Sequence, residues 1–466
     1  MAKSPQSHLK LSRYNYYLKA PKNHVLVYNS LSTASVVMTR GEWNRVKAIH
    51  RGMIPRKIQP YIETLLRFQI LVDAELDELA RFDTMHRMAR FGDGVLTLTI
   101  APTMACNFMC DYCYQSHDRD SRRMDKKTRD ALLAWIEPQL ANLKYLSVAW
   151  YGGEPTLAWE VIRDLTNRIR ERCDEHGVKT SFSMVTNGYA LTASKCKELD
   201  ALGIRSLQIT LDGPGPVHDT RRFTRGGRPS YEKILKNIAG VIQHSSARIN
   251  IRVNVDQRNQ NVIDALVTDL SERDLTLDNR CGLYFAPVDD CSPETKGVQH
   301  LIMQKKEFYH LENELHRMSR SKRLSGERYP GRSSHGGCAA VSKNGWVVLP
   351  DGDIHRCWND VSNPECRVGS LFSHDRRSRD EVNNIQWLSW EYEEMCRNCK
   401  ALPLCVGGCP YKDIRPDIFG KPGKLKCRRY LYNIRDNLRD YAELRQYAMN
   451  TVPVGASEPV GDTESG

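Results

Sequence analysis

The segment with the most information in this chain reads Met104-Ala105-Cys106-Asn107-Phe108-Met109-Cys110-Asp111-Tyr112-Cys113-Tyr114. Three residues separate its first two cysteines, and two residues separate the last two. Three thiolates at this spacing can hold three irons of a cubane iron–sulfur cluster, and no fourth cysteine is near enough to close the site. One iron is then left open for a small molecule. A zinc site is the alternative, although zinc prefers four ligands, often in paired Cys-x-x-Cys units.

Length and composition indicate a soluble protein of two or three domains. The 466 residues exceed one ordinary core, and 40% hydrophobic with 27% charged residues is typical of globular chains. No apolar run reaches the roughly 18 residues that span a bilayer, and residues 1–10 lack the apolar core of a signal peptide. We therefore expect a cytoplasmic protein without a membrane partner.

The cysteine content and the net charge indicate which kinds of site and partner to expect. The 15 cysteines are an odd number in a long chain and fall mostly in clusters, which favours metal sites in a reducing compartment over disulfides. The net charge of +12 is spread over short basic pairs such as Arg221-Arg222. Because the sequence has no dense basic tract, a solvated surface is favoured over nucleic-acid binding.

Between Gly92 and Asp290, short β-type runs alternate with amphipathic helical stretches, which predicts successive βα units and a parallel sheet. Six strands are expected, at Leu96–Ile100, Leu146–Trp150, Thr180–Val185, Ser206–Leu211, Ile249–Val255 and Gly282–Ala286. Six strands indicate a barrel that does not fully close. The predicted fold class is therefore α/β, with a partial (β/α)6 TIM-like barrel at its centre.

Unusual residues follow five of these strands. The cysteine loop follows the first strand, and the others are followed in turn by Tyr151-Gly152-Gly153-Glu154-Pro155, Thr186-Asn187-Gly188, Asp212-Gly213-Pro214 and Asn254. In a parallel barrel the carboxyl ends of all strands open on the same face, where active sites are built. The sequence therefore predicts that these segments line one pocket.

The cysteine spacing, with an aromatic residue just before the last cysteine, resembles the signature of the radical S-adenosylmethionine (SAM) enzymes. In that family the open iron is chelated by the amino and carboxylate groups of SAM. An electron from the cluster then releases a 5′-deoxyadenosyl radical that abstracts hydrogen from carbon. The resemblance implies that Cys106, Cys110 and Cys113 hold this 4Fe-4S cluster. It also implies an external electron donor such as flavodoxin or ferredoxin.

Further segments resemble the SAM-binding motifs of the family. Gly152-Gly153-Glu154-Pro155 is similar to the motif for the SAM amino group, since paired glycines allow close backbone approach and oxygen acceptors suit an ammonium. The run from Leu211 to Arg222 is similar to a stretch whose arginine lies near the SAM carboxylate, which implies Arg222, with Arg221 as the alternative. The implied cofactor-binding residues are Tyr112 beside the adenine, Gly152, Gly153, Glu154, Pro155, Asn187, Asp212, Arg222 and Asn254.

Seven cysteines near the C-terminus resemble the SPASM domain, an auxiliary iron–sulfur module found after radical SAM barrels. Thirteen residues separate Cys338 from Gly352, and four more precede Cys357. Further along, gaps of two, five and three residues separate Cys396, Cys399, Cys405 and Cys409, and Cys427 completes the set. The family pattern implies two auxiliary 4Fe-4S clusters. The implied ligands are Cys396, Cys399, Cys405 and Cys427 for one cluster, and Cys338, Cys357 and Cys409 for the other. Zinc remains the alternative for such knuckles.

Seven thiolates serve two cubanes that need eight ligands. Some family members supply the eighth from a cysteine shortly upstream of the first, but Ser333, Ser334 and His335 stand there in this chain. Either Cys291, Cys366 or His335 closes the site, or one iron stays open for a substrate thiolate. The other cysteines are expected to be buried and to pack in the apolar core.

The first ninety residues form a different pattern. Strands are expected at Tyr14–Leu18, His24–Tyr28 and Ala34–Met38, followed by helices at Glu42–Ile49 and Tyr61–Leu71. The pattern resembles the small winged-helix-like modules that recognise precursor peptides, and a structural extension of the barrel is the alternative. The expected domains are 1–90 for this module, 91–300 for the barrel, 301–335 for bridging helices near Leu301–Met318, 336–440 for the SPASM domain and 441–466 for a tail with a disordered end.

SPASM-bearing radical enzymes act mainly on peptides and proteins. The sulfatase-maturing members carry an acid directly after the second SPASM cysteine, whereas this chain has Trp358. With the N-terminal module, this difference predicts a radical SAM peptide maturase that acts on a ribosomally made precursor peptide with a leader and forms a thioether or carbon–carbon crosslink. The alternatives are an anaerobic sulfatase-maturing (formylglycine-generating) enzyme and, more distantly, a non-catalytic metal-binding scaffold. No general base is identified.

Overall fold

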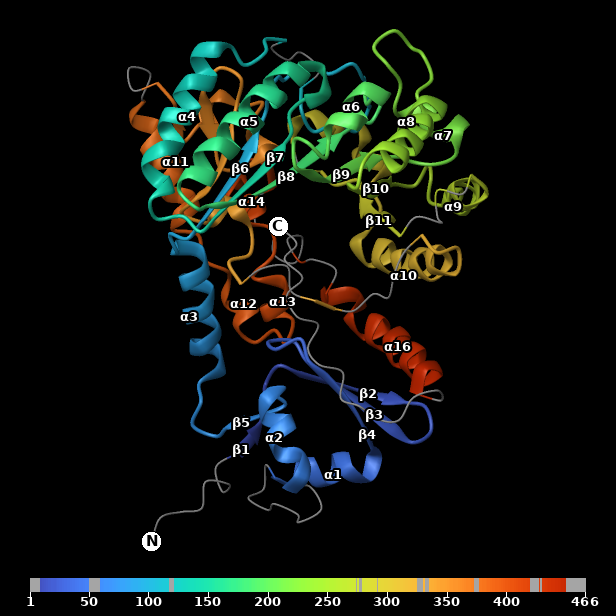
Figure 1. Ribbon diagram of the computed structural model, residues 1–466. Coiled ribbons are helices and arrows are strands. Elements are labelled where there is room, and N and C mark those ends of the chain that lie inside the picture. The colour runs from blue at the N-terminus through green and yellow to red at the C-terminus, as the bar shows by residue number, and fades with distance from the viewer. Residues whose placement is uncertain are drawn as a thin grey trace.

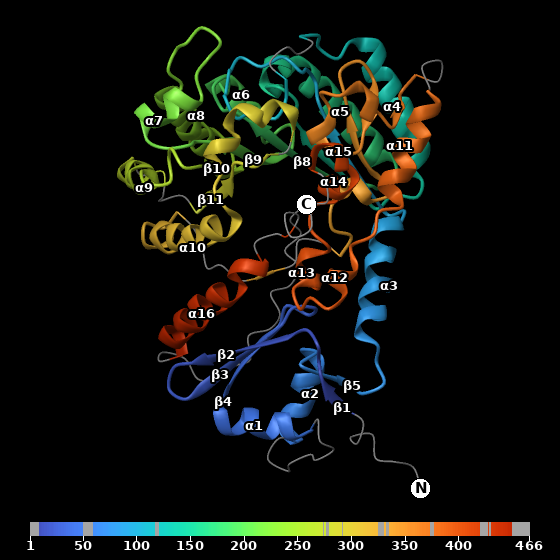
Figure 2. The same cartoon turned by 180° about the vertical axis from the view of Figure 1, so that it is seen from behind.

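The computed structural model describes residues 9–49, 59–116, 121–273, 275, 279–290, 292–324, 330–331, 335–372, 377–419, 427 and 430–449. Figure 1 shows an elongated arrangement, with the barrel at one end, the N-terminal module at the other and the helices α12 (Glu394–Arg397) and α13 (Leu402–Cys405) between them. Helix α3 (Glu78–Phe91) runs along one side from the module to the barrel (Figures 1 and 2). The Asp77 side chain caps its start by accepting hydrogen bonds from the amides of Leu79 and Ala80.

Six parallel strands, neighbouring one another in chain order, form the barrel sheet. They are β6 (Val95–Ile100), β7 (Tyr145–Trp150), β8 (Lys179–Thr186), β9 (Ile204–Thr210), β10 (Arg248–Val255) and β11 (Cys281–Pro287). Every predicted strand is confirmed, with ends that agree within two residues. The α/β partial barrel is therefore the fold of this region.

Helices form the outer layer of the barrel (Figure 1). They are α4 (Lys126–Leu140), α5 (Trp159–Glu175), α6 (Ala193–Glu198), α7 (Gly215–Arg221), α8 (Tyr231–His244), α9 (Ile263–Glu272) and α10 (Lys305–Ser321). Their apolar stripes, such as Ile162 and Leu165 of α5, are fully buried in the same core as Leu98 and Val148 of the strands. Burial of these side chains fixes the strands relative to one another. The residues at the strand ends are thereby held in position.

The sheet continues beyond the sixth predicted strand. Strand β12 (Gly345–Val348) pairs parallel with β6, and β13 (Asp353–His355) and β14 (Gly369–Ser370) extend it in antiparallel fashion to nine strands. These strands lie inside the predicted SPASM region, so that region shares a sheet with the barrel. Their two to four residues are too few to show an alternating pattern in the sequence.

The N-terminal module contains an antiparallel sheet of β2 (Asn15–Ala20), β3 (His24–Asn29) and β4 (Ser35–Thr39), with a second pairing of β1 (Leu9–Leu11) with β5 (Leu71–Asp73). Helix α1 (Arg40–Ile49) follows the sheet. The predicted helix Tyr61–Leu71 is wrong at its end, because α2 (Gln59–Arg67) stops before Gln69. Gln69 has a φ of 56°, which turns the chain so that Leu71 joins β5.

Helix α11 and several short helical turns make up most of the remaining C-terminal region that the structure describes. They are η4 (Ala339–Val341), η5 (Trp358–Asp360), η6 (Pro364–Cys366), α11 (Ser378–Leu388), α14 (Pro410–Ile414) and α15 (Pro416–Phe419). The long α16 (Tyr430–Met449) packs Ile434 and Leu438 against Tyr16 and Leu26 of the N-terminal sheet (Figure 2). It extends past the predicted start of the tail at 441, and the predicted disordered end lies outside the described residues. None of the described helices is both long and apolar enough to cross a bilayer.

Candidate active site

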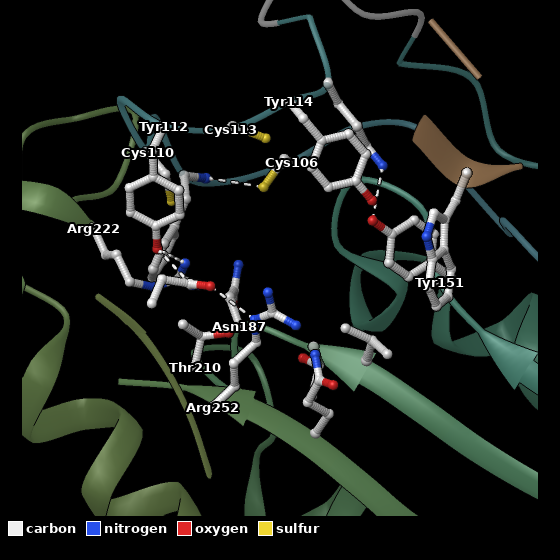
Figure 3. Close-up of a pocket in the computed structure, with 18 of the residues that line it drawn as sticks. Cys106, Cys110, Tyr112, Cys113, Tyr114, Tyr151, Asn187, Thr210, Arg222 and Arg252 are labelled. Carbon is white, nitrogen blue, oxygen red and sulfur yellow. Dashed lines mark hydrogen bonds between the residues drawn. The ribbon is translucent and has the colours of Figure 1, made fainter. Parts of the chain in front are cut away.

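A cavity of about 460 Å³ opens at the carboxyl ends of the barrel strands (Figure 3). It is lined by all three cysteines of the first loop, and the residues predicted for the cofactor that also line it are Tyr112, Gly152, Gly153, Asn187, Arg222 and Asn254. Segments from five strand ends therefore meet at one place. Glu154, Pro155 and Asp212, which were predicted with them, are not among the lining residues.

The two glycines after β7 let this segment lie directly on the cysteine loop. Gly153 N donates to Thr103 O at 3.3 Å, and Glu154 N donates to Ala105 O at 2.8 Å. A Cβ on Gly152, whose φ is +122°, would lie 2.3 Å from Thr103 O, and a Cβ on Gly153 would lie 2.2 Å from the carbonyl oxygen of Met104. Glycine is therefore required to shape the cysteine loop, as well as to leave the backbone open to a ligand.

The Glu154 carboxylate points away from the cavity. It is fully buried and accepts hydrogen bonds from Thr186 Oγ1 and the Asn187 amide, both at 2.7 Å, and from the Thr156 amide at 3.0 Å. These bonds tie the end of β7 to the end of β8. Glu154 therefore acts on the cavity through Asn187, whose side chain in turn donates to Asn107 Oδ1 of the cysteine loop at 2.8 Å.

Tyr112 joins the cysteine loop to the ends of β9 and β10. Its hydroxyl donates to Asp212 and accepts from Arg222 Nη1 at 2.6 Å and Asn254 Nδ2 at 3.3 Å. Burial raises the pKa of Tyr112 well above its usual value, so the hydroxyl stays protonated. Asp212 lies behind this wall, fully buried, and also accepts from the Asn254 amide at 2.8 Å. Figure 3 shows Tyr112 and Arg222 on one side of the cavity.

The adjacent arginines differ in their surroundings. The Arg221 side chain is 1% exposed and its Nη1 donates to Asp256 at 2.6 Å, inside the protein. Its Nη2 donates to the carbonyl oxygen of Asn254 at 3.1 Å. Arg222 instead lines the cavity. Of the two alternatives from the sequence, only Arg222 faces the space where a cofactor can bind.

Sequence reasoning missed several polar residues on the floor of the cavity. Gln208 and Thr210 of β9, and Arg252 of β10, line it together with Asn254. Figure 3 shows Thr210 and Arg252 among them. Arg252 Nε donates to Asn254 Oδ1 at 2.7 Å. These residues occupy alternate positions near the strand ends, and alternate residues of a strand share a face. The sequence does carry a signal that could have predicted these residues: polar side chains stand at alternate positions near the ends of otherwise apolar strands.

The C-terminal region closes one side of the cavity. Trp358 and Asn359 line it, and the ring centroids of Trp358 and Tyr151 lie 5.0 Å apart. Asp289, just after β11, also lines the cavity and pairs with Lys412 Nζ of α14 at 2.7 Å. The site is therefore shared between the barrel and the cysteine-rich region.

Several C-terminal cysteines pack together with one buried apolar cluster, which contains Cys357 and is contacted by Cys338, Cys396, Cys399 and Cys409. The pKa of the Cys357 thiol is raised well above its usual value by burial, and further by the neighbouring Asp360, Cys338 and Cys409. In the described part of the chain, no three His, Cys, Asp or Glu side chains are clustered tightly enough to ligate one metal ion. Cys291 lies outside the described residues.

Comparison with known proteins identifies the class. Residues 100–253 match the model of the Radical SAM superfamily, and this segment begins at the end of β6 and contains the three-cysteine loop. Together with the partial barrel, the match identifies a radical SAM domain within residues 100–253. The chain is related to the anaerobic sulfatase-maturating enzymes.

Three comparisons illustrate this relationship. The chain is 24% identical over 335 residues to the cysteine-type anaerobic sulfatase-maturating enzyme of Clostridium perfringens, which covers 67% of this chain and 88% of that protein. Identity to the serine-type enzyme of Klebsiella aerogenes is also 24% over 335 residues, covering 68% and 79%. The solved structure of hexahistidine-tagged anSMEcpe with bound AdoMet has a TM-score of 0.59 at 21% identity, covering 77% of this chain and 96% of that one, and it supports the fold.

Proposed function

We propose that this enzyme is a peptide maturase that abstracts hydrogen from a side chain of a ribosomally made precursor peptide and forms a thioether or carbon–carbon crosslink. The observation that carries the proposal is Trp358. It stands directly after Cys357, lines the cavity and packs against Tyr151. An aromatic wall suits a bulky peptide side chain and offers no proton acceptor at that position.

The residues of the cavity suit the family's cofactors. Cys106, Cys110 and Cys113 would hold the 4Fe-4S cluster, and bound SAM would supply a 5′-deoxyadenosyl radical. The Arg222 guanidinium suits the SAM carboxylate as a charge-assisted partner. Open backbone at Gly152 and Gly153 suits its ammonium group. We assign the adenine and ribose side to Tyr112, Asn187 and Asn254, which Glu154, Pro155 and Asp212 support from behind.

Two auxiliary 4Fe-4S clusters would accept the electron that remains after hydrogen abstraction, a one-electron task that side chains do not perform. We assign Cys396, Cys399, Cys405 and Cys427 to one cluster, and Cys338, Cys357 and Cys409 to the other. Flavodoxin or ferredoxin would reduce the first cluster. We place the enzyme in the cytoplasm, since free thiolates persist in a reducing compartment.

The N-terminal module would hold the leader of the precursor peptide. Strand β4 is at one edge of the three-stranded sheet, and an extended peptide can add to such an edge through backbone hydrogen bonds. A second cavity of about 330 Å³ lies where the module meets the region of α12 and α13. Arg13, Tyr17, Trp43 and Lys400 line it, which suits acidic and aromatic side chains of a leader.

Sulfatase maturation is the second candidate. It is favoured by the similarity to the sulfatase-maturating enzymes and by Asp289, which brings a carboxylate into the cavity from a different position in the chain. A carboxylate at the reacting centre can take the proton that formylglycine formation releases.

The test is anaerobic reconstitution with iron, sulfide, dithionite and SAM, followed by mass spectrometry. We expect 5′-deoxyadenosine from the enzyme and none from the Cys106→Ala, Cys110→Ala, Cys113→Ala triple variant. Peptides encoded beside the gene should lose two hydrogen atoms and give crosslinked fragments. A sulfatase-motif peptide that instead gains an aldehyde, trapped by a hydrazide probe, would transfer the assignment to sulfatase maturation. Failure to cleave SAM would overturn both.

A further inference from the structure

Two guanidinium groups line the cavity at the strand ends, those of Arg222 and Arg252. The proposed function uses one of them, because SAM carries a single carboxylate and that carboxylate is assigned to Arg222. Arg252 of β10 is the second, and Figure 3 shows its side chain extending from the strand into the cavity. A cationic side chain directed into a cavity that receives a substrate suits an anionic group of that substrate.

The contacts of Arg252 are with uncharged groups. Its Nε donates to Asn254 Oδ1 at 2.7 Å, its Nη1 donates to the Tyr284 hydroxyl at 3.4 Å, and its guanidinium lies 5.9 Å from the centre of the Tyr284 ring. Arg221, by contrast, pairs with Asp256 at 2.6 Å. Arg252 forms no ion pair with any residue that the structure describes, so its charge is available to a ligand.

The carboxylate of Asp289 lines the same cavity but has another partner. Its two oxygens accept hydrogen bonds from Lys412 Nζ at 2.9 and 2.7 Å. Lys412 is buried, and this pairing balances its charge. Asp289 is therefore neutralised by Lys412 rather than by Arg252.

Gln208 adds a second donor to the same part of the cavity. The Tyr284 hydroxyl donates to Gln208 Oε1 at 2.5 Å, and it accepts from Arg252. The amide nitrogen of Gln208 then keeps its hydrogens for a ligand, since it donates to none of the described residues. A guanidinium and an amide nitrogen offer donors and no acceptor, which is the combination that binds a carboxylate.

Both side chains lie below the ends of their strands. Arg252 stands two residues before Asn254 on β10, and Gln208 stands two residues before Thr210 on β9. Alternate residues of a strand share a face, so each pair points to the same side. The residues assigned to SAM lie nearer the strand ends or in the segments that follow them. The deeper pair is therefore left for the substrate.

The geometry points to a carboxylate subsite formed by Arg252 and Gln208, which binds an aspartate or glutamate side chain of the peptide substrate. Tyr284 is a positioning residue that orients both. The inference rests on the proposed function and narrows its substrate class to peptides with an acidic residue within or beside the crosslinked segment. A planar guanidinium can hold a carboxylate through two parallel N–H groups, so this contact would fix the peptide relative to SAM.

The test measures peptide binding to the iron-loaded, SAM-bound enzyme without a reductant, so that no chemistry takes place. The probes are acetyl-Gly-Gly-Glu-Gly-Gly-amide and its aspartyl and glutaminyl counterparts, in equilibrium dialysis. We expect at least one acidic peptide to bind about 10-fold more tightly than the glutaminyl peptide.

Two substitutions should remove this preference and leave the affinity for SAM unchanged. Arg252→Gln removes the guanidinium. Gln208→Glu keeps an oxygen for the Tyr284 hydroxyl but gives Arg252 a carboxylate partner within the protein, so an acidic peptide would be repelled. Arg248→Gln is the matched control and should keep the full preference, because Arg248 is exposed at the start of the same strand and does not line the cavity.

Equal binding of the acidic and glutaminyl peptides by the unsubstituted enzyme would overturn the inference, as would a preference that survives either substitution. Loss of SAM affinity in Arg252→Gln would assign this arginine to the SAM carboxylate and also overturn it. SAM cleavage and crosslinking are measured separately with dithionite, so the subsite and the proposed function fail independently.

Discussion

The Tyr112 hydroxyl accepts a hydrogen bond from Arg222 Nη1 at 2.6 Å, which joins the cysteine loop to the end of α7 at one side of the cavity. Because Tyr112 also contacts Asp212 and Asn254, one phenol orients the loop of the first cluster and the guanidinium proposed to bind SAM. The two halves of the proposed cofactor site are therefore coupled through a single side chain.

Removing that hydroxyl should weaken SAM binding. Tyr112→Phe leaves Arg222, Asp212 and Asn254 without a shared buried partner. Unpaired buried polar groups of this kind cost about 1–3 kcal/mol of stabilising free energy. We expect an affinity about 10-fold lower for SAM, by equilibrium dialysis with the reconstituted enzyme. Tyr145→Phe, at the opposite end of β7, serves as the control. Equal affinities of the two variants would contradict the coupling.

Substitutions of the two adjacent arginines should have different effects, one on protein stability and the other on SAM binding. Arg221→Ala removes one partner of the buried pair with Asp256 and should lower the free energy of unfolding by about 3 kcal/mol or more. Arg222→Ala should instead abolish most SAM binding. Thermal unfolding and SAM binding, measured on both variants, check the split. The reverse pattern would assign the cofactor to Arg221.

Gly153→Ala should disturb the first cluster. The new Cβ would meet the carbonyl oxygens of Met104 and Ala105 at 2.2 and 2.3 Å, which forces the backbone of the cysteine loop to move. We expect iron to be lost from this cluster while the auxiliary clusters remain, by iron analysis and electron paramagnetic resonance. Gly282→Ala is the matched control, because its Cβ would meet nothing within 4 Å. Full iron content in Gly153→Ala would show that the loop adapts.

Acid should destabilise the buried region around Asp212, behind the Tyr112 side of the cavity. His218 Nδ1 accepts from the Asp212 amide at 3.2 Å, and burial holds the pKa of His218 well below 6.5. Because the unfolded chain binds this proton more readily, the contribution of His218 is complete above about pH 6.5 and falls below it, by at most about 1.4 kcal/mol per pH unit. Thermal unfolding at several pH values should therefore show a shallower acid slope for His218→Gln. Identical slopes would exclude His218 as the cause.

The local patterns of the chain were sufficient to locate the six barrel strands. Alternating apolar strands and amphipathic helices have periods of about 2 and 3.6 residues that burial imposes directly, so all six barrel strands could be located. The segments at their ends could be assigned to one face for the same reason. The pairing of β12 with β6 could not be predicted, because Gly345–Val348 is too short to carry a period and its partner lies far away in sequence.

The sequence by itself determined the barrel, the spacing of the cysteines and the set of segments that meet at the strand ends. Only the tertiary structure decided which side chains face the cavity: Arg222 rather than Arg221, Asn187 rather than Glu154, and Trp358 and Asp289 from distant segments. The physical reason is that spacing along the chain sets which residues share an element. The direction of a polar side chain depends instead on the buried partners that packing brings to it from other elements.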